Sequence, residues 1–161
     1  VLEDGEVLQL GSQNWTVLHT PGHHPEHLCL ISDSGLIAGD MVAGIGTILV
    51  PPGQGDMMTY IEQLERLLDL DPHLIFPSHG PVIPLPSRTL EHYIRHRSIR
   101  HDKVLAAVEE GKLELDLIAK IAYQDTPNAH PGLAVDQTLS HLLSHEKDGK
   151  VMRVDGGWVR T

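Results

Sequence analysis

Four histidines fall within nine residues of the segment VLHTPGHHPEHLCLI, which spans residues 17–31. An unpaired histidine is costly to bury, and its ring nitrogens bind metal ions or transfer protons near neutral pH, so this density indicates chemistry. His19, His23 and His27 recur every four residues, a spacing that would align them on one face of a helix. Two prolines and a glycine exclude a continuous helix there and disfavour a zinc motif of the HExxH type. We therefore expect a loop after a strand, with a Pro-Gly turn that presents His23.

Two further segments end an apolar strand with a metal-ligand residue type beside a glycine. GLIAGD ends with Asp40, and HLIFPSHG places His79 before its glycine. Taken singly, each is typical of a turn or a surface histidine. Taken together they fit a metal site, because such a site needs ligands that converge from distant parts of the chain beside small neighbours. We predict that His23, Asp40 and His79 are metal ligands.

The remaining histidines of the first segment are expected outside the set of metal ligands. His19 is interpreted as a strand-end residue, and His27 as a residue that hydrogen-bonds a ligand or braces the loop. The role of His24 stays open, because it directly follows His23 and would point elsewhere.

The pattern around these segments predicts an α/β layer followed by a helical region. Short apolar runs predict strands near residues 6–11, 15–20, 27–32 and 35–40, and a short buried strand near residues 73–77. Between the last two, residues 56–72 have the apolar spacing of a helix with one buried face, capped by Asp56. The glycine-rich segment 41–56 either lines the site or simply connects. Beyond residue 86 we expect a long helix that Ser87 caps and that reaches Glu110, helices near 113–124 and 132–149, and a final hairpin.

The composition excludes several classes of protein. A net charge of −10 argues against a surface that binds polyanions generally, and 40% apolar residues are enough for a core. The single Cys29 excludes an internal disulfide framework and a cysteine-rich zinc knuckle. No apolar stretch approaches the length of a membrane span. We expect a cytoplasmic protein with no membrane partner.

Three motifs together resemble a known family. HTPGHHPEH, GLIAGD and FPSHGPVI, with the helix YIEQLERLLDLDP between the last two, look like the third, fourth and fifth motifs of the metallo-β-lactamase superfamily. YIRHRSIR and the helical tail are similar to the branch of lactamase-like endoribonucleases and glyoxalase-II-like hydrolases. The resemblance implies an α/β fold: the C-terminal half of an αββα sandwich over residues 1–86, then a small winged-helix-like domain over residues 87–161.

By this resemblance, His23 would bind a first metal ion, Asp40 would bridge two ions within the catalytic centre, and His79 would bind the second. Neutral imidazoles and a carboxylate with two oxygens suit Zn²⁺, and two zinc ions are expected per complete site. The superfamily's HxHxDH motif, which supplies most of the other ligands, does not occur in the 161 residues. We therefore expect the chain to be the C-terminal portion of a longer protein, active only with the missing N-terminal segment.

The implied function is hydrolysis by a metal-bound hydroxide. The substrate would be single-stranded RNA in the ribonuclease branch and a small thioester in the glyoxalase-II branch. A non-catalytic nucleic-acid-binding module and an inactive fragment are the alternatives. Arginines and lysine between Arg88 and Lys103 could meet phosphates or pair with acidic neighbours. The helix with His141, His145 and Lys147 could read DNA, but it lacks arginine, so packing, substrate access or a homodimer contact is expected instead.

Overall fold

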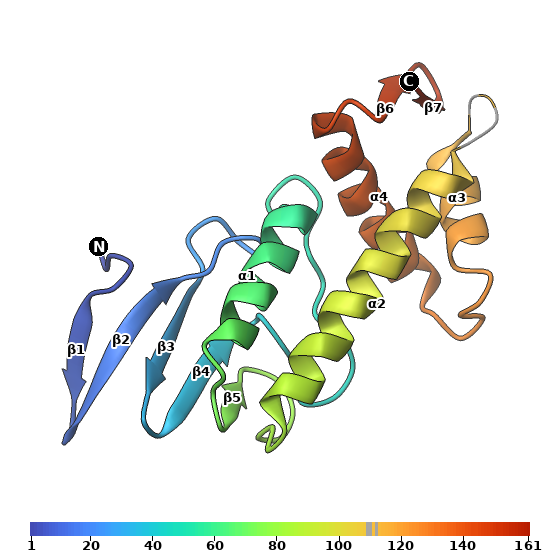
Figure 1. The fold of residues 1–161 in the computed structure, drawn as a ribbon. Helices are drawn as coiled ribbons and strands as arrows, with labels where there is room; N and C mark the ends of the chain where they lie inside the picture. Colours follow the sequence, from blue (N-terminus) through green and yellow to red (C-terminus); the bar gives the residue numbers. More distant parts are fainter. Residues whose placement is uncertain (109–110, 112) are drawn as a thin grey trace.

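Alternating apolar residues build a five-stranded mixed sheet in the first half of the chain. The computed structural model describes residues 1–108, 111 and 113–161 (Figure 1). The strands follow one another across the sheet in chain order; the first four are antiparallel, and the last is parallel to its neighbour. Their bounds are β1 Val7–Leu10, β2 Gln13–His19, β3 Leu28–Ser32, β4 Gly35–Gly39 and β5 Ile75–Pro77. The predicted α/β class is confirmed.

The crossover from β4 to β5 is made by α1, Met57–Asp69. The carboxylate of Asp56 caps the helix by accepting a hydrogen bond from the backbone amide of Thr59 at 2.9 Å, as predicted. The buried face of α1 consists of Met57, Tyr60, Ile61, Leu64 and Leu67. It packs on the side of the sheet that presents Leu18, Cys29 and Leu36.

The opposite face of the sheet carries a shallow apolar hollow of about 490 Å³. Trp15, Ile37 and Phe76 line it, and its other lining residues belong to β4, β5 or the residue that follows β5. Figure 1 shows α1 and α2 on one side of the sheet. Within the described part of the chain, the hollow is therefore bounded by the sheet alone.

The second half contains three helices and a hairpin in the predicted order. They are α2 Pro86–Ala107, α3 Leu115–Ala122, α4 Pro131–Lys147, β6 Val151–Val154 and β7 Gly157–Arg160. These elements have their own apolar cluster, which includes Val104, Ile118, Leu142 and Trp158. None of the described helices is both long and apolar enough to cross a bilayer.

The predicted start of α2, with Ser87 as its N-cap, is wrong by two residues. Leu85 is the N-cap and Pro86 is the first helical residue, because proline has no amide hydrogen to leave unpaired there. The hydroxyl of Ser87 bonds the carboxylate of Asp71 at 3.3 Å instead of capping the helix. The helix ends at Ala107, and the expected end at Glu110 lies outside the described residues.

Burial argues against two of the alternatives that we weighed for charged surfaces. Arg97 and Arg100, which we considered for phosphate binding, are 2% and 4% exposed. His141 and His145, considered for DNA reading, are 0% and 1% exposed. These four side chains are buried and make their contacts inside the protein, so they are not accessible to a nucleic acid.

Replacing Asp56 by alanine should lower the free energy of unfolding by about 1 kcal/mol, because the amide of Thr59 loses its cap. Urea denaturation measures the change. The same carboxylate also pairs with Lys147 at 3.0 Å, so Lys147→Ala is the control for the ion pair. Lys147→Ala should cost less than Asp56→Ala, because an exposed pair contributes little. Equal losses for the two variants would contradict the capping role.

Candidate metal centre

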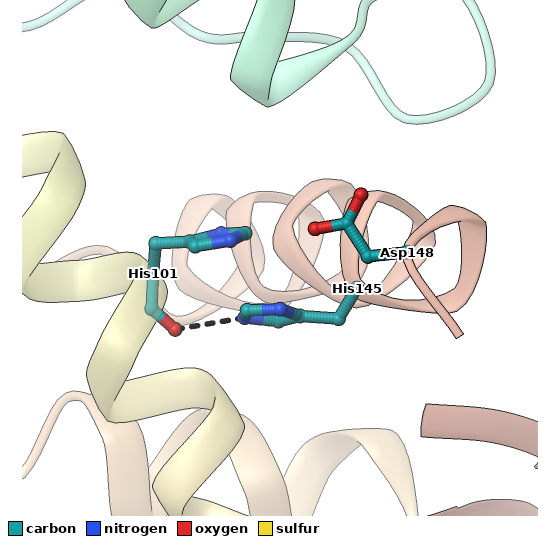
Figure 2. A group of neighbouring side chains, drawn as sticks. All are labelled: His101, His145 and Asp148. Carbon is teal, nitrogen blue, oxygen red and sulfur yellow. Dashed lines mark hydrogen bonds between the residues drawn. The ribbon is translucent and has the colours of Figure 1, made fainter. Parts of the chain in front are cut away.

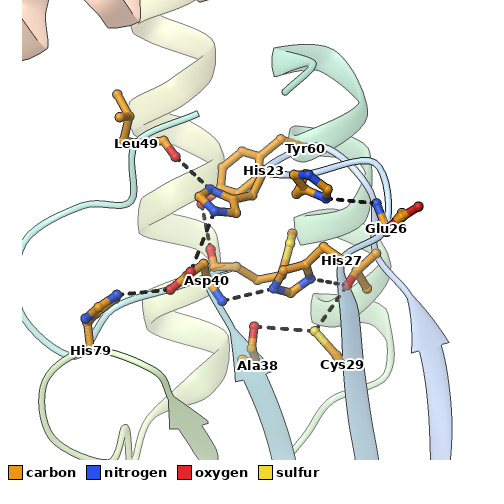
Figure 3. A network of polar contacts seen from close by, with 12 residues as sticks. His23, Glu26, His27, Cys29, Ala38, Asp40, Leu49, Tyr60 and His79 are labelled. Carbon is orange, nitrogen blue, oxygen red and sulfur yellow. Dashed lines mark hydrogen bonds and ion pairs between the residues drawn. The ribbon is translucent and has the colours of Figure 1, made fainter. Parts of the chain in front are cut away.

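Asp40, His79 and His23 come together at one end of the sheet (Figure 3). Asp40 directly follows β4, and His79 follows β5 by two residues, so the parallel pairing of these strands places both side chains at the same edge. His23 enters from the loop between β2 and β3. Nε2 of His23 lies 3.6 Å from Oδ2 of Asp40, and Nε2 of His79 lies 3.3 Å from Oδ1. His79 is the most exposed, with 69% of its side chain accessible.

The protonation of His23 is set by a backbone carbonyl. Its Nδ1 lies 2.8 Å from the carbonyl oxygen of Leu49, which only accepts, so Nδ1 carries the proton. In the neutral form of the ring, Nε2 then presents a lone pair toward the carboxylate of Asp40. Oδ1 of Asp40 is buried and accepts no hydrogen bond from the described residues. Facing lone pairs repel unless a proton or cation lies between them, so this donor set fits metal ions.

The carboxylate of Asp40 lies between the imidazoles of His23 and His79 and separates them. These three residues do not form a group whose ligand atoms all lie within 4.8 Å of one another. In the described part of the chain, such a group is formed by His101, His145 and Asp148. His23 and His79 instead approach different oxygens of Asp40. A carboxylate with one imidazole at each oxygen suits two neighbouring cations better than a single one.

His27 lies behind this site and holds the backbone of Asp40. Its Nε2 accepts a hydrogen bond from the backbone amide of Asp40 at 3.0 Å, so its proton is on Nδ1, which donates to Oγ1 of Thr20 at 2.8 Å. Both ring nitrogens are therefore used. Burial, and then the neighbouring His23, lower the pKa of His27 and keep the ring neutral.

The hydrogen bonds continue from His27 into the sheet. The hydroxyl of Thr20 lies 3.3 Å from Sγ of Cys29, and the thiol donates to the carbonyl of Ala38 at 3.4 Å. Burial raises the pKa of the Cys29 thiol to about 12, so it stays protonated. The bonds from Cys29 to Ala38 and from Asp40 to His27 thus fix the backbone on both sides of Gly39.

The other two histidines of the loop point away from Asp40. Nε2 of His19 donates to the carbonyl oxygen of Pro25 at 2.8 Å, which braces the loop from its outer side. Nδ1 of His24 accepts a hydrogen bond from the amide of Glu26 at 3.3 Å. Within the described contacts, His19 therefore supports the loop that carries His23 without touching either ring at the site.

The loop that orients His23 is held by the helical half of the chain. Arg97 of α2 donates to the carbonyl of Ile48 and to Oε1 of Gln137. Gln137 and Ser140 of α4 both donate to the carbonyl of Val50, at 3.0 Å and 2.6 Å. The carbonyl of Leu49, which bonds His23, lies between these two fixed groups. Sequence reasoning missed this contact, because no local pattern marks a buried arginine.

Comparisons with known proteins identify the family of this chain. Residues 1–79 match the sequence model of the family described as the metallo-beta-lactamase superfamily. The chain belongs to the metallo-β-lactamase superfamily. It is 37% identical over 144 residues to the beta-lactamase-like protein 2 homolog of Drosophila melanogaster, a match that covers 86% of this chain and 47% of the relative.

Two other superfamily proteins extend the comparison. A beta-lactamase domain protein from Burkholderia ambifaria superposes with a TM-score of 0.86 and 26% identity, over 99% of this chain and 52% of that one. The atrochrysone carboxyl ACP thioesterase of Paecilomyces divaricatus is 23% identical over 94% of this chain and 48% of its own length. The chain thus spans about half the length of these relatives.

In this superfamily chain, Gly39→Ala should disturb the support of Asp40. An added Cβ would lie 2.5 Å from Nε2 of His27, and the backbone φ of +52° is unfavourable for any other residue. We expect a loss of about 2–3 kcal/mol in unfolding free energy and weaker binding of Zn²⁺, measured by denaturation and calorimetry.

Gly46→Ala is the matched control, because Gly46 also has a positive φ of +82° but nothing within 4 Å of its Cβ position. It should cost only about 1 kcal/mol from backbone strain and leave Zn²⁺ affinity unchanged. If the two variants bind Zn²⁺ equally well, the clash with His27 does not matter for the site.

Arg97→Lys should loosen the loop that carries Leu49, because a single ammonium group does not reproduce the bonds of the guanidinium to Ile48 and Gln137. We expect a loss of about 2–3 kcal/mol in unfolding free energy and at least about tenfold weaker Zn²⁺ binding. The exposed Arg95→Lys on the same helix is the control and should change stability by less than about 0.5 kcal/mol. A folded Arg97→Lys protein with undiminished Zn²⁺ affinity would contradict the positioning role.

Proposed function

We propose that the chain is part of a metal-dependent hydrolase whose centre is Asp40. The observation that carries this proposal is the buried, unbonded Oδ1 of Asp40, with imidazole nitrogens at 3.6 Å and 3.3 Å from the two oxygens of the carboxylate. His23 and His79 would each hold one divalent cation, and Asp40 would bind both. When bound, such ions lower the pKa of water toward neutrality and stabilise a developing oxyanion.

The residues of this chain would contribute position and charge. The carbonyl of Leu49 would hold His23 in the tautomer with the proton on Nδ1, which leaves Nε2 as the ligand nitrogen of the neutral ring. His27 fixes the backbone of Asp40, which limits rotation of the carboxylate. The single negative charge of Asp40 does not balance two divalent cations, so further ligands are required.

We propose that these further ligands come from a segment outside the 161 residues. The relatives are about twice as long as the matched region, and the superfamily motif HxHxDH does not occur in this sequence. The apolar hollow of Trp15, Ile37 and Phe76 offers such a segment a face of the sheet on which to pack. Activity would then belong to the assembled sandwich, and the helical tail would act as a winged-helix-like support.

A thioester is the favoured substrate class. One relative, whose match covers 94% of this chain, is named a thioesterase. Single-stranded RNA is the second candidate, favoured by an exposed hollow on α2 that Arg88, His92 and Arg95 line together with the acidic Glu91. Because Arg97 and Arg100 are buried, this hollow carries less positive charge than the sequence indicated.

Asp40→Asn should remove activity in the full-length form. An amide offers one oxygen and no charge, so it holds two cations poorly. We expect bound metal to fall from about two ions per chain and kcat/KM to fall at least about 100-fold. Acyl thioester hydrolysis and cleavage of single-stranded RNA are both assayed, with metal analysis on the same samples.

The exposed Asp33→Asn in the β3–β4 turn is the matched control and should retain both metal and activity. Thioester turnover that disappears in Asp40→Asn supports the favoured substrate, and RNA cleavage alone supports the second. A protein that holds no metal, or that hydrolyses neither substrate, contradicts the proposed function.

A further inference from the structure

A second group of metal-ligand side chains lies where α2 meets the end of α4 (Figure 2). His101 comes from α2, His145 from the last turn of α4, and Asp148 is the C-cap of α4. One ligand atom of each residue lies within 4.8 Å of the others. His101 and His145 are 7% and 1% exposed, and their rings stack with centroids 3.6 Å apart.

The free nitrogen of His145 is defined by its backbone bond. Nε2 lies 3.0 Å from the carbonyl oxygen of His101, so Nε2 carries the proton and donates it. Nδ1 is then a lone-pair acceptor, and it is buried with no partner among the described residues. Histidine ligands of metal ions commonly donate their other ring N–H to a carbonyl in this way.

His101 offers a nitrogen on the same side. Its Nδ1 lies 3.1 Å from Nδ1 of His141, so one of the two atoms carries a proton. If His101 donates that proton, its Nε2 is left as a second acceptor. The carboxylate of Asp148 completes the group, and the ammonium of Lys150 bonds only Oδ2, at 3.0 Å. Two imidazole nitrogens and a carboxylate therefore lie close together, and none of them donates a hydrogen bond to another.

We propose that His101, His145 and Asp148 form a second site for a divalent transition-metal ion, separate from the centre at Asp40. Two imidazoles with one carboxylate favour Zn²⁺ over the oxygen-preferring Mg²⁺ and Ca²⁺. Three protein ligands leave one position of a tetrahedral ion for water. The ion would connect the middle of α2 with the end of α4, so its effect would be to stabilise the helical half.

The charges around the group set a limit on its affinity. Lys150 is close enough to bond Asp148, and its positive charge opposes a second cation. His141, which contacts His101, is fully buried. The exposed ammonium of Lys150 thus opposes a cation, and the carboxylates of Asp148 and Asp102 attract it.

The test titrates Zn²⁺ into the 161-residue protein carrying His23→Gln and Asp40→Asn, so that the first centre is disabled. Nitrogen-15 NMR of labelled histidines identifies the coordinating atoms, and calorimetry gives the affinity. We expect one ion per chain, with coordination shifts at Nε2 of His101 and Nδ1 of His145. Asp148→Asn in this background should weaken binding at least tenfold, because it removes a ligand charge at an exposed position.

Asp155→Asn is the matched control, because Asp155 is an exposed residue of the β6–β7 turn and should bind Zn²⁺ as the background does. His145→Gln serves as a second variant, since its amide is able to donate to the carbonyl of His101 while the ligand nitrogen is lost. Circular dichroism shows that each variant is folded. Unshifted resonances of His101 and His145 at saturating Zn²⁺, or equal affinity in Asp148→Asn and Asp155→Asn, would overturn the proposal.

Discussion

Three consecutive carbonyl groups join the candidate metal centre to the rest of the molecule. Those of Ile48 and Val50 accept hydrogen bonds from α2 and α4, and the one between them, of Leu49, orients His23. A loop rich in glycine and proline has little stiffness of its own, so its geometry depends on these bonds. The helical half is therefore part of what positions the site, although the hydrogen bond and ion pairs described for Asp40 all come from His23, His27 and His79.

Local patterns were sufficient for most of the first half of the fold. Strand runs, the cap at Asp56 and the buried face of α1 each follow from residues close in sequence, and the structure has them where expected. The candidate ligands could be named for the same reason, since each follows a strand and lies beside a glycine. Their convergence follows from the parallel pairing of β4 and β5, which the helix between them predicts.

Long-range partners account for what the sequence did not reveal. Arg97 is 40 residues from Gln137 and 49 from Ile48, so nothing near it indicates that its charge is buried. The sequence alone does not distinguish an exposed basic helix face from a buried, hydrogen-bonding arginine. The cluster of His101 and His145 was hidden in the same way, because it needs two helices that are separated by the whole of α3.

The thiol of Cys29 has a practical consequence. It is fully buried, it is bonded to Thr20 and Ala38, and it is the only cysteine of the chain. An alkylating reagent reaches that sulfur only when the central strands separate, since a buried protonated thiol is unreactive. The rate at which Cys29 is alkylated therefore measures how often the sheet next to Asp40 opens. Because Cys29 is a native residue, no added label is needed.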